Sequence, residues 1–332
     1  MSDLGGNTVL LFFKGFETDR FIPGDRYLKR LVRPVYDRLH RRKKVTGFAV
    51  TYQLMVRALR EQGYDVRSND YRTARRHPRH PVGLFGFSHI LDGWDLPNPR
   101  VLGVGMYDNP RLAPDLMNDP LNRFYLVPGE WVRRMFEPFY GDRCGVWHAG
   151  IDLEEWPDTR ANPKTVDVLV YDKIHWERER LERELLHPIL ARLECDGLRT
   201  EVLRYGGHDR AGYRSALARS RCMIFLGEHE TMGLAYQEAL ASNLPILAWD
   251  IGFWQDPQRE AHGLGTVPAT SVPYFSDECG DRFRGPHDFD EAFDRFRARL
   301  DSYEPRQFIA REMTFEKSAR LYMSYYEQAH TP

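Results

Sequence analysis

The sequence predicts an α/β protein of two domains, each built on a doubly wound parallel sheet. Three observations lead to this prediction. Short, continuous apolar runs, such as residues 9–13, have the pattern of strands that are buried on both faces. Segments with helical periodicity separate these runs at short spacing, which is the order of elements in parallel sheets. The chain of 332 residues is also long enough for two domains of ordinary size.

The first half of the chain is predicted to form one sheet with its covering helices. A strand over residues 9–13, a helix over 48–62 that stops at Gly63, and a strand over 64–66 make a first strand–helix–strand unit. Further elements are expected downstream: strands over 81–87, 101–106, 124–127 and 144–147, and a helix over 130–139.

The second half shows a more regular alternation. Strands are predicted over 166–171, 200–204, 222–226 and 245–249, and helices over 176–193, 209–219, 232–241 and 305–328. Pro188 is expected to kink the first of these helices. The polar segment between Pro157 and Pro163 predicts the domain boundary, which places the first domain at 1–157 and the second at 158–304. We expect a cleft between the carboxyl edges of the two sheets, where ligands bind in such folds.

Composition and charge exclude several classes of protein. Lys plus Arg number 47 and Asp plus Glu 48, and the resulting net charge of −1 excludes a globally basic nucleic-acid binder. The longest apolar runs span about five residues, far below the roughly 20 that cross a bilayer. Residues 1–6 lack the basic and apolar regions of a signal peptide, and the 4 cysteines form no C-x-x-C pair. We therefore expect a cytoplasmic protein with reduced thiols.

Residues 225–241 carry the clearest chemical signal. A strand ends at Leu226, Glu230 lies in the acidic turn that follows, and Glu238 lies eight positions later in the next helix. The amide groups of residues 231–233 are expected at the N-terminus of this helix, where an anion such as a diphosphate is favoured. Carboxylates accept hydrogen bonds from the vicinal hydroxyls of a sugar or ribose. The alternative is that both glutamates are solvated charges at a helix end.

This stretch resembles the E-x7-E signature of the retaining GT-B glycosyltransferases, the group 1, family-4-like class. The resemblance includes the Glu-x-x-Gly start at Glu230, the Glu-Ala-Leu-Ala run from Glu238 and the Pro-Ile-Leu-Ala run from Pro245. Residues 147–156, with Gly-Ile-Asp, are similar to the interdomain segment of these enzymes, and residues 48–66 to their first helix and second strand. The resemblance implies two facing Rossmann-like domains, with a terminal helix at 305–332 that crosses back to the first domain.

The resemblance also implies roles for residues of the second domain. Glu238 would bind the ribose hydroxyls of a donor nucleotide, and Glu230, a catalytic candidate, would contact the hydroxyls of the donor sugar. The backbone around the helix start would hold sugar and phosphate, through Thr231, Met232, Gly233 and Leu234. Lys173 matches the lysine that binds the diphosphate in the family, with a plain surface lysine as the alternative. The family's arginine is absent there, and Arg204 is the candidate to replace it.

The first domain departs further from the family. The histidine that the family often has after the strand expected here over 101–106 is replaced by Tyr-Asp-Asn-Pro at 107–110. Asp108 is therefore a candidate for a polar catalytic role, unless it only initiates a turn. His89 is the other catalytic candidate in this half, unless it is a structural histidine beside an apolar run.

Residues 26–44 form a basic segment with nine Lys or Arg and a helical stripe of apolar residues. The residues predicted to contact an acceptor or a membrane are Arg38, Arg41, Arg42, Lys43 and Lys44. Three alternatives stay open for this segment. It could dock peripherally on anionic lipid at the inner face of the membrane, hold a phosphorylated or polyanionic acceptor, including nucleic acid, or form a solvated helical flap.

The resemblance implies a glycosyltransferase that moves a sugar from a nucleotide diphosphate sugar to a hydroxyl acceptor. The acceptor is expected to be a glycan, a lipid-linked molecule or another polyanionic molecule. Retention and the lack of an obligatory metal or cofactor, apart from the donor substrate, are implied by the resemblance. Two alternatives are a nucleotide-sugar 2-epimerase on the same fold and a non-catalytic protein that binds a nucleotide or glycan. The sequence leaves the oligomeric state open.

Overall fold

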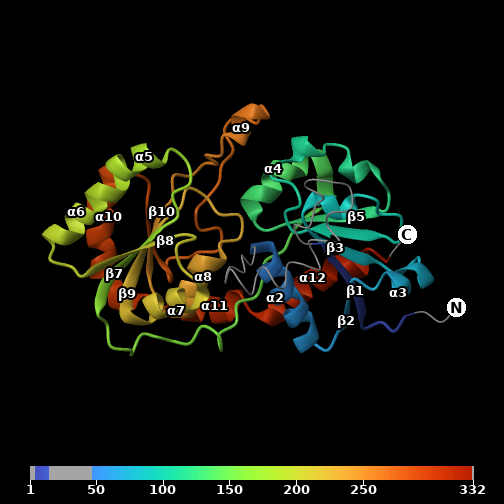
Figure 1. The fold of residues 1–332 in the computed structure, drawn as a ribbon, viewed down its shortest axis with the longest axis horizontal. Coiled ribbons are helices and arrows are strands. Elements are labelled where there is room, and N and C mark those ends of the chain that lie inside the picture. The colour runs from blue at the N-terminus through green and yellow to red at the C-terminus, as the bar shows by residue number, and fades with distance from the viewer. Residues whose placement is uncertain (1–3, 15–46, 331–332) are drawn as a thin grey trace, which may run out of the picture. The chain divides into compact units, whose positions relative to one another are not determined.

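The computed structural model describes residues 4–14 and 47–330, and the chain divides into two compact units (Figure 1). Within this part of the chain, unit 1 consists of residues 4–14, 47–127, 136–149 and 318–330, and unit 2 of residues 128–135 and 150–317. The predicted contact residues Arg38, Arg41, Arg42, Lys43 and Lys44 lie outside the described residues. The predicted division at 157 and 304 stays a prediction.

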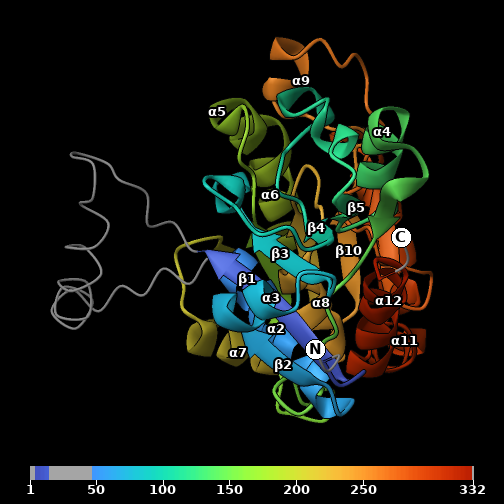
Figure 2. The same ribbon diagram turned by 90° about the vertical axis from the view of Figure 1, so that its right-hand side faces the viewer.

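Unit 1 is built on a six-stranded sheet in which all paired strands are parallel, with the order β2-β1-β3-β4-β5-β6. Figure 2 shows β1, β3, β4 and β5 following one another across this sheet. The strands are β1 (Thr8–Lys14), β2 (Asp65–Ser68), β3 (Val82–Gly86), β4 (Arg100–Gly103), β5 (Asn122–Val127) and β6 (Cys144–Val146). The first strand is continuous and apolar because both of its faces are covered, and residues 9–12 are fully buried.

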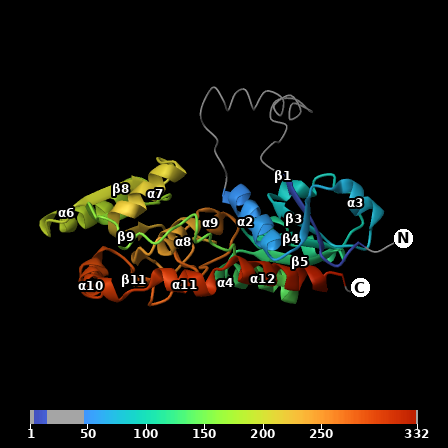
Figure 3. The same ribbon diagram turned by 90° about the horizontal axis from the view of Figure 1, so that it is seen from below.

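The helices of unit 1 cover both faces of this sheet. They are α2 (Gly47–Glu61), α3 (Tyr71–Arg76), α4 (Glu130–Tyr140), which continues from unit 2, and the C-terminal α12 (Phe315–Gln328). The hydroxyl of Tyr326 on α12 accepts a hydrogen bond from the Leu10 amide at 2.9 Å and donates one to the Pro81 carbonyl at 2.6 Å. These bonds fasten α12 against the sheet (Figure 3). Short 3-10 turns are η1 (Ser88–Leu91), η2 (Pro110–Leu112), η3 (Leu116–Asn118) and η4 (Gly141–Arg143).

Unit 2 is built on a five-stranded parallel sheet with the order β11-β10-β9-β7-β8. The strands are β7 (Val166–Asp172), β8 (Thr200–Arg204), β9 (Ser220–Leu226), β10 (Ile246–Trp249) and β11 (Gly280–Phe283). The chain leaves β7 toward β8 on one side and later returns to β9 on the other. This reversal is the switch point at which ligands bind in doubly wound folds.

Two apolar layers enclose the unit 2 sheet (Figure 1). One face is covered by α7 (Arg210–Arg219), α8 (Leu234–Ala241) and α11 (Pro305–Glu312), and the other by α5 (Arg178–Leu181), α6 (His187–Cys195) and α10 (Pro286–Ala298). The short α9 (Gln258–Ala261) and the 3-10 turn η6 (Leu300–Ser302) complete the unit.

Apart from the 3-10 turns, four elements were not expected from the sequence, and two predicted helices are interrupted. The unexpected elements are α3, α9, α10 and β11. The helix predicted over 305–328 is divided into α11 and α12. The predicted helix over 176–193 is divided into α5, a π-helical segment Glu182–Leu186 and α6. Pro188 lies in the first turn of α6 and has no N–H to donate to the preceding turn, which accounts for the change of helix type. In the described part of the chain, no helix combines the length and apolar character that crossing a membrane requires.

Candidate functional site

The candidate site is built at the switch point of the unit 2 sheet, where β7 and β9 lie side by side. Asp172 at the end of β7 pairs in register with Leu226 at the end of β9. Two loops therefore start next to each other, residues 173–177 after β7 and residues 227–233 after β9. Both leave the carboxyl edge of the sheet, where parallel α/β sheets bind their ligands.

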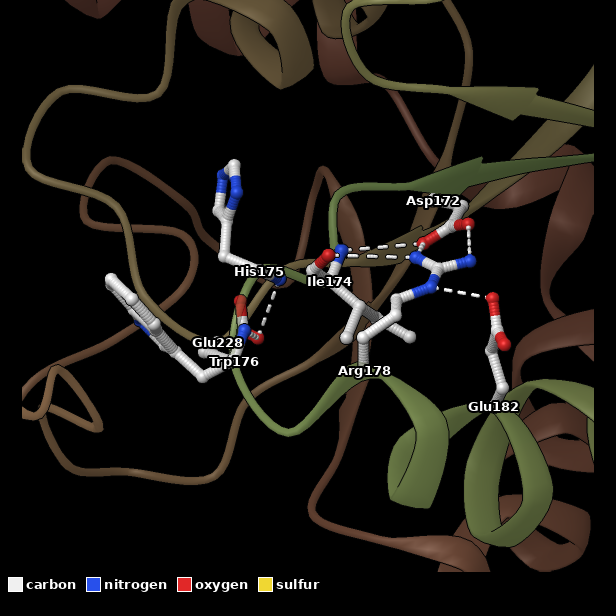
Figure 4. Close-up of polar contacts among 7 residues, drawn as sticks. All are labelled: Asp172, Ile174, His175, Trp176, Arg178, Glu182 and Glu228. Atoms are coloured by element: carbon white, nitrogen blue, oxygen red, sulfur yellow. Dashed lines mark hydrogen bonds and ion pairs between the residues drawn. The ribbon is translucent and has the colours of Figure 1, made fainter.

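A buried ion pair fixes the start of the first loop. Asp172 is 2% exposed, and the Arg178 guanidinium donates a hydrogen bond of 2.6 Å to each of its carboxylate oxygens (Figure 4). The same guanidinium donates through Nε to Glu182 at 2.6 Å, and the Ile174 amide donates to Asp172 Oδ1 at 3.2 Å. This bidentate ion pair fixes the orientation of the two side chains relative to each other. The loop between Asp172 and Arg178 is thus held at both ends.

A second carboxylate fixes the middle of the same loop. Glu228 is 2% exposed, and its Oε1 accepts hydrogen bonds from the amides of His175 at 2.8 Å and Trp176 at 2.9 Å (Figure 4). The Lys173 amide donates to the Leu226 carbonyl at 2.8 Å. The two loops are therefore tied to each other, and the backbone that carries Lys173 has a defined position.

The structure brings together two of the predicted site residues, Lys173 and Glu230. The ammonium of Lys173 forms an ion pair with Glu230 Oε1, and the two side chains are 17% and 10% exposed. Lys173 Nζ also lies 4.8 Å from the ring centre of Tyr205, an exposed residue just after β8. Opposite charges thus meet at the switch point in a largely buried ion pair.

Contacts from separate segments of unit 2 fix the loop that carries Glu230. The indole N–H of Trp131 donates to the Glu230 carbonyl at 2.7 Å, and the Glu230 amide donates to the Thr270 carbonyl at 3.0 Å. Within the next helix, the Gln237 side-chain amide donates to the Met232 carbonyl at 2.6 Å. The loop is therefore rigid around Glu230, as a preorganised site requires.

Gly233 shapes the transition from this loop into α8. It has φ +80°, a left-handed conformation, and a Cβ at this position would run into the Tyr236 ring. Helix α8 begins two residues later than predicted from the sequence, at Leu234. Among the described residues, the amides of Leu234, Ala235 and Tyr236 have no hydrogen-bond partner. This group of free N–H groups is the positive end of the helix dipole and favours an anion.

Glu238 lies in the second turn of α8 and is paired with Arg210, the first residue of α7. Arg210 Nη1 lies 3.2 Å from Glu238 Oε1, and Glu238 is 8% exposed. Burial raises the pKa of Glu238 to about 8, although the charge of Arg210 lowers it in part. Burial also raises the pKa of Tyr171 on β7, and the charges of Tyr205, Glu230 and Glu238 raise it further. The charges of both predicted glutamates therefore raise the pKa of one buried tyrosine, Tyr171, at the end of β7.

His229, next to Glu230, is a neutral imidazole inside this site. Burial lowers the pKa of His229 to about 4, and the charges of Lys173 and His175 add to the effect. Its ring lies edge-on between Trp131 and Trp254, with ring centres 6.0 and 6.2 Å away. Its buried Nδ1 has no hydrogen-bond partner among the described residues. At neutral pH this Nδ1 can therefore donate or accept one hydrogen bond, depending on which ring nitrogen carries the proton.

The remaining predicted residues take no part in the ion pairs of Lys173 with Glu230 and of Arg210 with Glu238. Arg204 is exposed at the end of β8 and forms no ion pair among the described residues. Asp108 and His89 belong to unit 1: Asp108 is exposed before η2, and His89 lies in η1, where its carbonyl accepts a hydrogen bond from Lys14 Nζ at 2.9 Å. Thr231 is exposed and Met232 buried in the loop before α8. In the described ranges, no group of three His, Cys, Asp or Glu side chains could hold a metal ion.

Several residues of this site were not predicted from the sequence: Trp131, Arg178, Arg210, Glu228 and His229. Glu228 and His229 stand in the acidic turn that the sequence singles out, so the turn itself was the available signal. Trp131 lies 99 residues before its partner Glu230, and no local pattern connects them. Arg210 follows the N-cap residue of α7, a position that reports only where the helix begins.

Comparison with solved structures identifies the architecture. The structure of AviGT4, a glycosyltransferase involved in avilamycin A biosynthesis, matches with a TM-score of 0.53 at 12% sequence identity, over 97% of this chain and 98% of that one. Sucrose-phosphate synthase from Thermosynechococcus elongatus also matches with a TM-score of 0.53 at 12% identity, over 85% of this chain and 93% of that one. The fold is GT-B. Two Rossmann-like parallel-sheet domains, as predicted from the sequence, are thereby confirmed.

The GT-B assignment rests on structure alone. No protein-family model matches the chain, and no curated protein matches it by sequence. At 12% identity the likeness shows the fold, since one fold can host different chemistries. The E-x7-E motif and the family-4-like assignment stay predictions.

Proposed function

We propose that this protein is a glycosyltransferase that moves a sugar from a nucleotide diphosphate sugar to a hydroxyl acceptor. The observation that carries the proposal is the ion pair of Lys173 and Glu230 beside the free amides that open α8. A cation, a helix N-terminus and a carboxylate at one switch point match the diphosphate and the hydroxyls of such a donor. The GT-B fold and the resemblance of residues 230–238 to the E-x7-E signature support the same function.

The diphosphate is proposed to lie between Lys173 and the start of α8. Both groups are positive, and neither needs a metal to bind phosphate oxygens. When the bond to the sugar breaks, negative charge develops on the leaving diphosphate, and positive groups held in place beforehand stabilise it. Arg204, at the exposed end of β8, is a candidate for a further cation.

The two glutamates are proposed to bind the two sugar rings of the donor. Glu230 would accept hydrogen bonds from the transferred sugar, and Glu238 from the ribose. Retention at the anomeric carbon and independence from a metal belong to this proposal through the family resemblance. Asp108 and His89 stay candidates for catalytic roles, and residues 26–44 for contacts with a glycan, lipid-linked or other polyanionic acceptor.

A donor screen tests the function directly. Thermal-shift measurements with UDP-, GDP-, ADP- and CMP-sugars should single out one nucleotide, since a bound ligand stabilises by RT ln(1 + [L]/Kd). The selected donor should then be hydrolysed or transferred, and Glu230→Gln should lower turnover roughly 100-fold while the free nucleotide still binds. The variant keeps the shape of the side chain and removes its charge.

Two outcomes would contradict this proposal. Conversion of the donor sugar into its epimer without any acceptor would favour the 2-epimerase alternative, which needs proton transfer within one sugar. Tight nucleotide binding with no turnover for any donor in the panel would instead favour a binding protein.

A further inference from the structure

Glu238 is a buried acid, and its surroundings oppose its ionisation. Only 8% of Glu238 is exposed, and a carboxylate that leaves water without a compensating charge loses a large solvation energy. The charged or titratable side chains that act on it come from α7, β7 and the segment before β7: Arg210, Tyr213, Arg214, Tyr171 and Glu155. The two tyrosines are neutral because burial raises the pKa of each, and Glu155 adds negative charge.

Arg210 is the cation that offsets this burial. Among the described residues, Arg210 alone forms an ion pair with Glu238, at 3.2 Å. The guanidinium is itself fixed, because its Nε donates to Glu155 at 2.7 Å and its central carbon lies 4.9 Å from the Trp156 ring centre. The N-cap bond from the Gly212 amide to Asp209, at 2.7 Å, fixes the helix turn that carries Arg210. These contacts therefore hold the Arg210 guanidinium next to Glu238 without the help of a ligand.

We propose that Arg210 is a positioning residue, which aims the Glu238 carboxylate at the ribose hydroxyls of the donor and supplies the positive charge that lets this buried group ionise. The inference rests on the proposed function, since the ribose is part of the proposed donor. It assigns to this chain a charge from α7 that the E-x7-E signature does not contain. An ionised carboxylate accepts hydrogen bonds from both ribose hydroxyls, whereas a protonated one must donate its own proton.

The neighbouring Arg214 provides a matched control. Arg214 lies one turn further along α7, and its guanidinium also covers the Trp156 ring, at 5.8 Å. It donates to the Glu155 carbonyl at 3.5 Å and makes no ion pair with Glu238. Arg214→Ala therefore removes an equal charge and a similar ring contact, but not the contact that the proposal uses.

The first measurement needs no ligand. The carboxyl carbon of Glu238, labelled with 13C and assigned through Glu238→Gln, is titrated by NMR in the full-length protein. In Arg210→Ala the titration midpoint should rise by about one pH unit or more, while Arg210→Lys restores part of the difference. Arg214→Ala should raise the midpoint by clearly less than Arg210→Ala, because the charge of Arg214 acts on Glu238 without an ion pair. A midpoint that is the same in the wild type and in Arg210→Ala would overturn the proposal.

The second measurement connects this charge with the nucleotide. The Kd for UDP, GDP and ADP is measured between pH 7 and 9.5 for the wild type and the same variants. For the nucleotide that binds, Arg210→Ala should weaken affinity about fivefold or more at pH 8, and the loss should shrink as the pH rises, because only the ionised fraction is competent to bind. A loss that is constant with pH would point to a purely structural role and overturn the proposal.

The two measurements separate this inference from the proposed function. If none of the three nucleotides binds the wild type while the Glu238 midpoint still depends on Arg210, the electrostatic role of Arg210 is supported and the proposed function is contradicted. If a nucleotide binds and the Glu238 midpoint does not depend on Arg210, the proposed function is supported and the proposed role of Arg210 is contradicted. Thermal unfolding of each variant shows that it is folded, and Arg210→Lys supplies the comparison if Arg210→Ala is not.

Discussion

Lys173 and Glu230 form an ion pair although 57 residues separate them along the chain. Each residue follows one of two strands that are neighbours in the unit 2 sheet, β7 and β9. The parallel pairing of these strands brings both residues to the same edge of the sheet. A ligand that carries a diphosphate next to sugar hydroxyls would meet the cation and the carboxylate together.

Replacing Lys173 should weaken binding of the nucleotide diphosphate. In Lys173→Ala we expect the affinity for UDP, or for the nucleotide that the donor screen selects, to fall by about 1.5–3 kcal/mol, the usual contribution of a hydrogen bond to a charged group. Isothermal titration calorimetry measures this change. Lys317→Ala is the matched control, because Lys317 also pairs with a glutamate, Glu312, at 2.9 Å. Equal losses in both variants would contradict the role of Lys173.

Gly233 should tolerate no side chain. Gly233→Ala combines an unfavourable left-handed conformation with a clash against the Tyr236 ring, so we expect a destabilisation of about 2–4 kcal/mol and loss of nucleotide binding. Gly206→Ala separates the two causes: Gly206 has a similar φ of +78°, but no heavy atom lies within 4 Å of the added Cβ. Gly206→Ala should lower the free energy of unfolding by about 1 kcal/mol. Chemical unfolding measures both, and equal costs would show that the ring contact is unimportant.

The stability of the wild type should depend on pH through Glu238. Burial raises the pKa of Glu238 to about 8 from an ordinary 4.5, so the folded protein holds this proton more tightly than the unfolded chain. The resulting stability is fully present below the ordinary pKa and is lost as the pH rises through about 8.

The variant Glu238→Gln cannot titrate and therefore isolates this effect. Between pH 5 and pH 8.5 the wild type should lose up to about 4 kcal/mol of unfolding free energy relative to Glu238→Gln. Urea unfolding of both proteins at the two pH values measures the difference. The same pH dependence in both would mean that Glu238 titrates like an exposed acid.

The indole N–H of Trp131 should stabilise the loop that carries Glu230. Trp131→Phe keeps an aromatic ring but removes the buried 2.7 Å hydrogen bond to the Glu230 carbonyl, so we expect a loss of about 1–2 kcal/mol. Trp94→Phe is the control, because the buried Nε1 of Trp94 has no hydrogen-bond partner among the described residues. Thermal unfolding should show the larger shift for Trp131→Phe, and a larger shift for Trp94→Phe would contradict the interpretation.

Local sequence patterns predicted most of the secondary structure. The strand expected over 9–13 is Thr8–Lys14, and the helix expected over 48–62 is Gly47–Glu61, because apolar runs and glycine stops act within a few residues. The strand β11, Gly280–Phe283, was missed because only its end residues are buried and its pairing with β10 stabilises it. The helix α10 was missed although Phe289, Phe293 and Phe296 show helical spacing.

The sequence by itself determined the fold class, the turn at residues 227–233, and the identities of Lys173, Glu230 and Glu238 as candidates. These features depend on neighbours in the chain, or on a motif of nine consecutive residues. Only the tertiary structure decided which charges meet: Lys173 with Glu230, and Arg210 with Glu238. Such partners lie on different strands and helices, so the order of strands in the sheet sets their distance, and no spacing along the sequence encodes it.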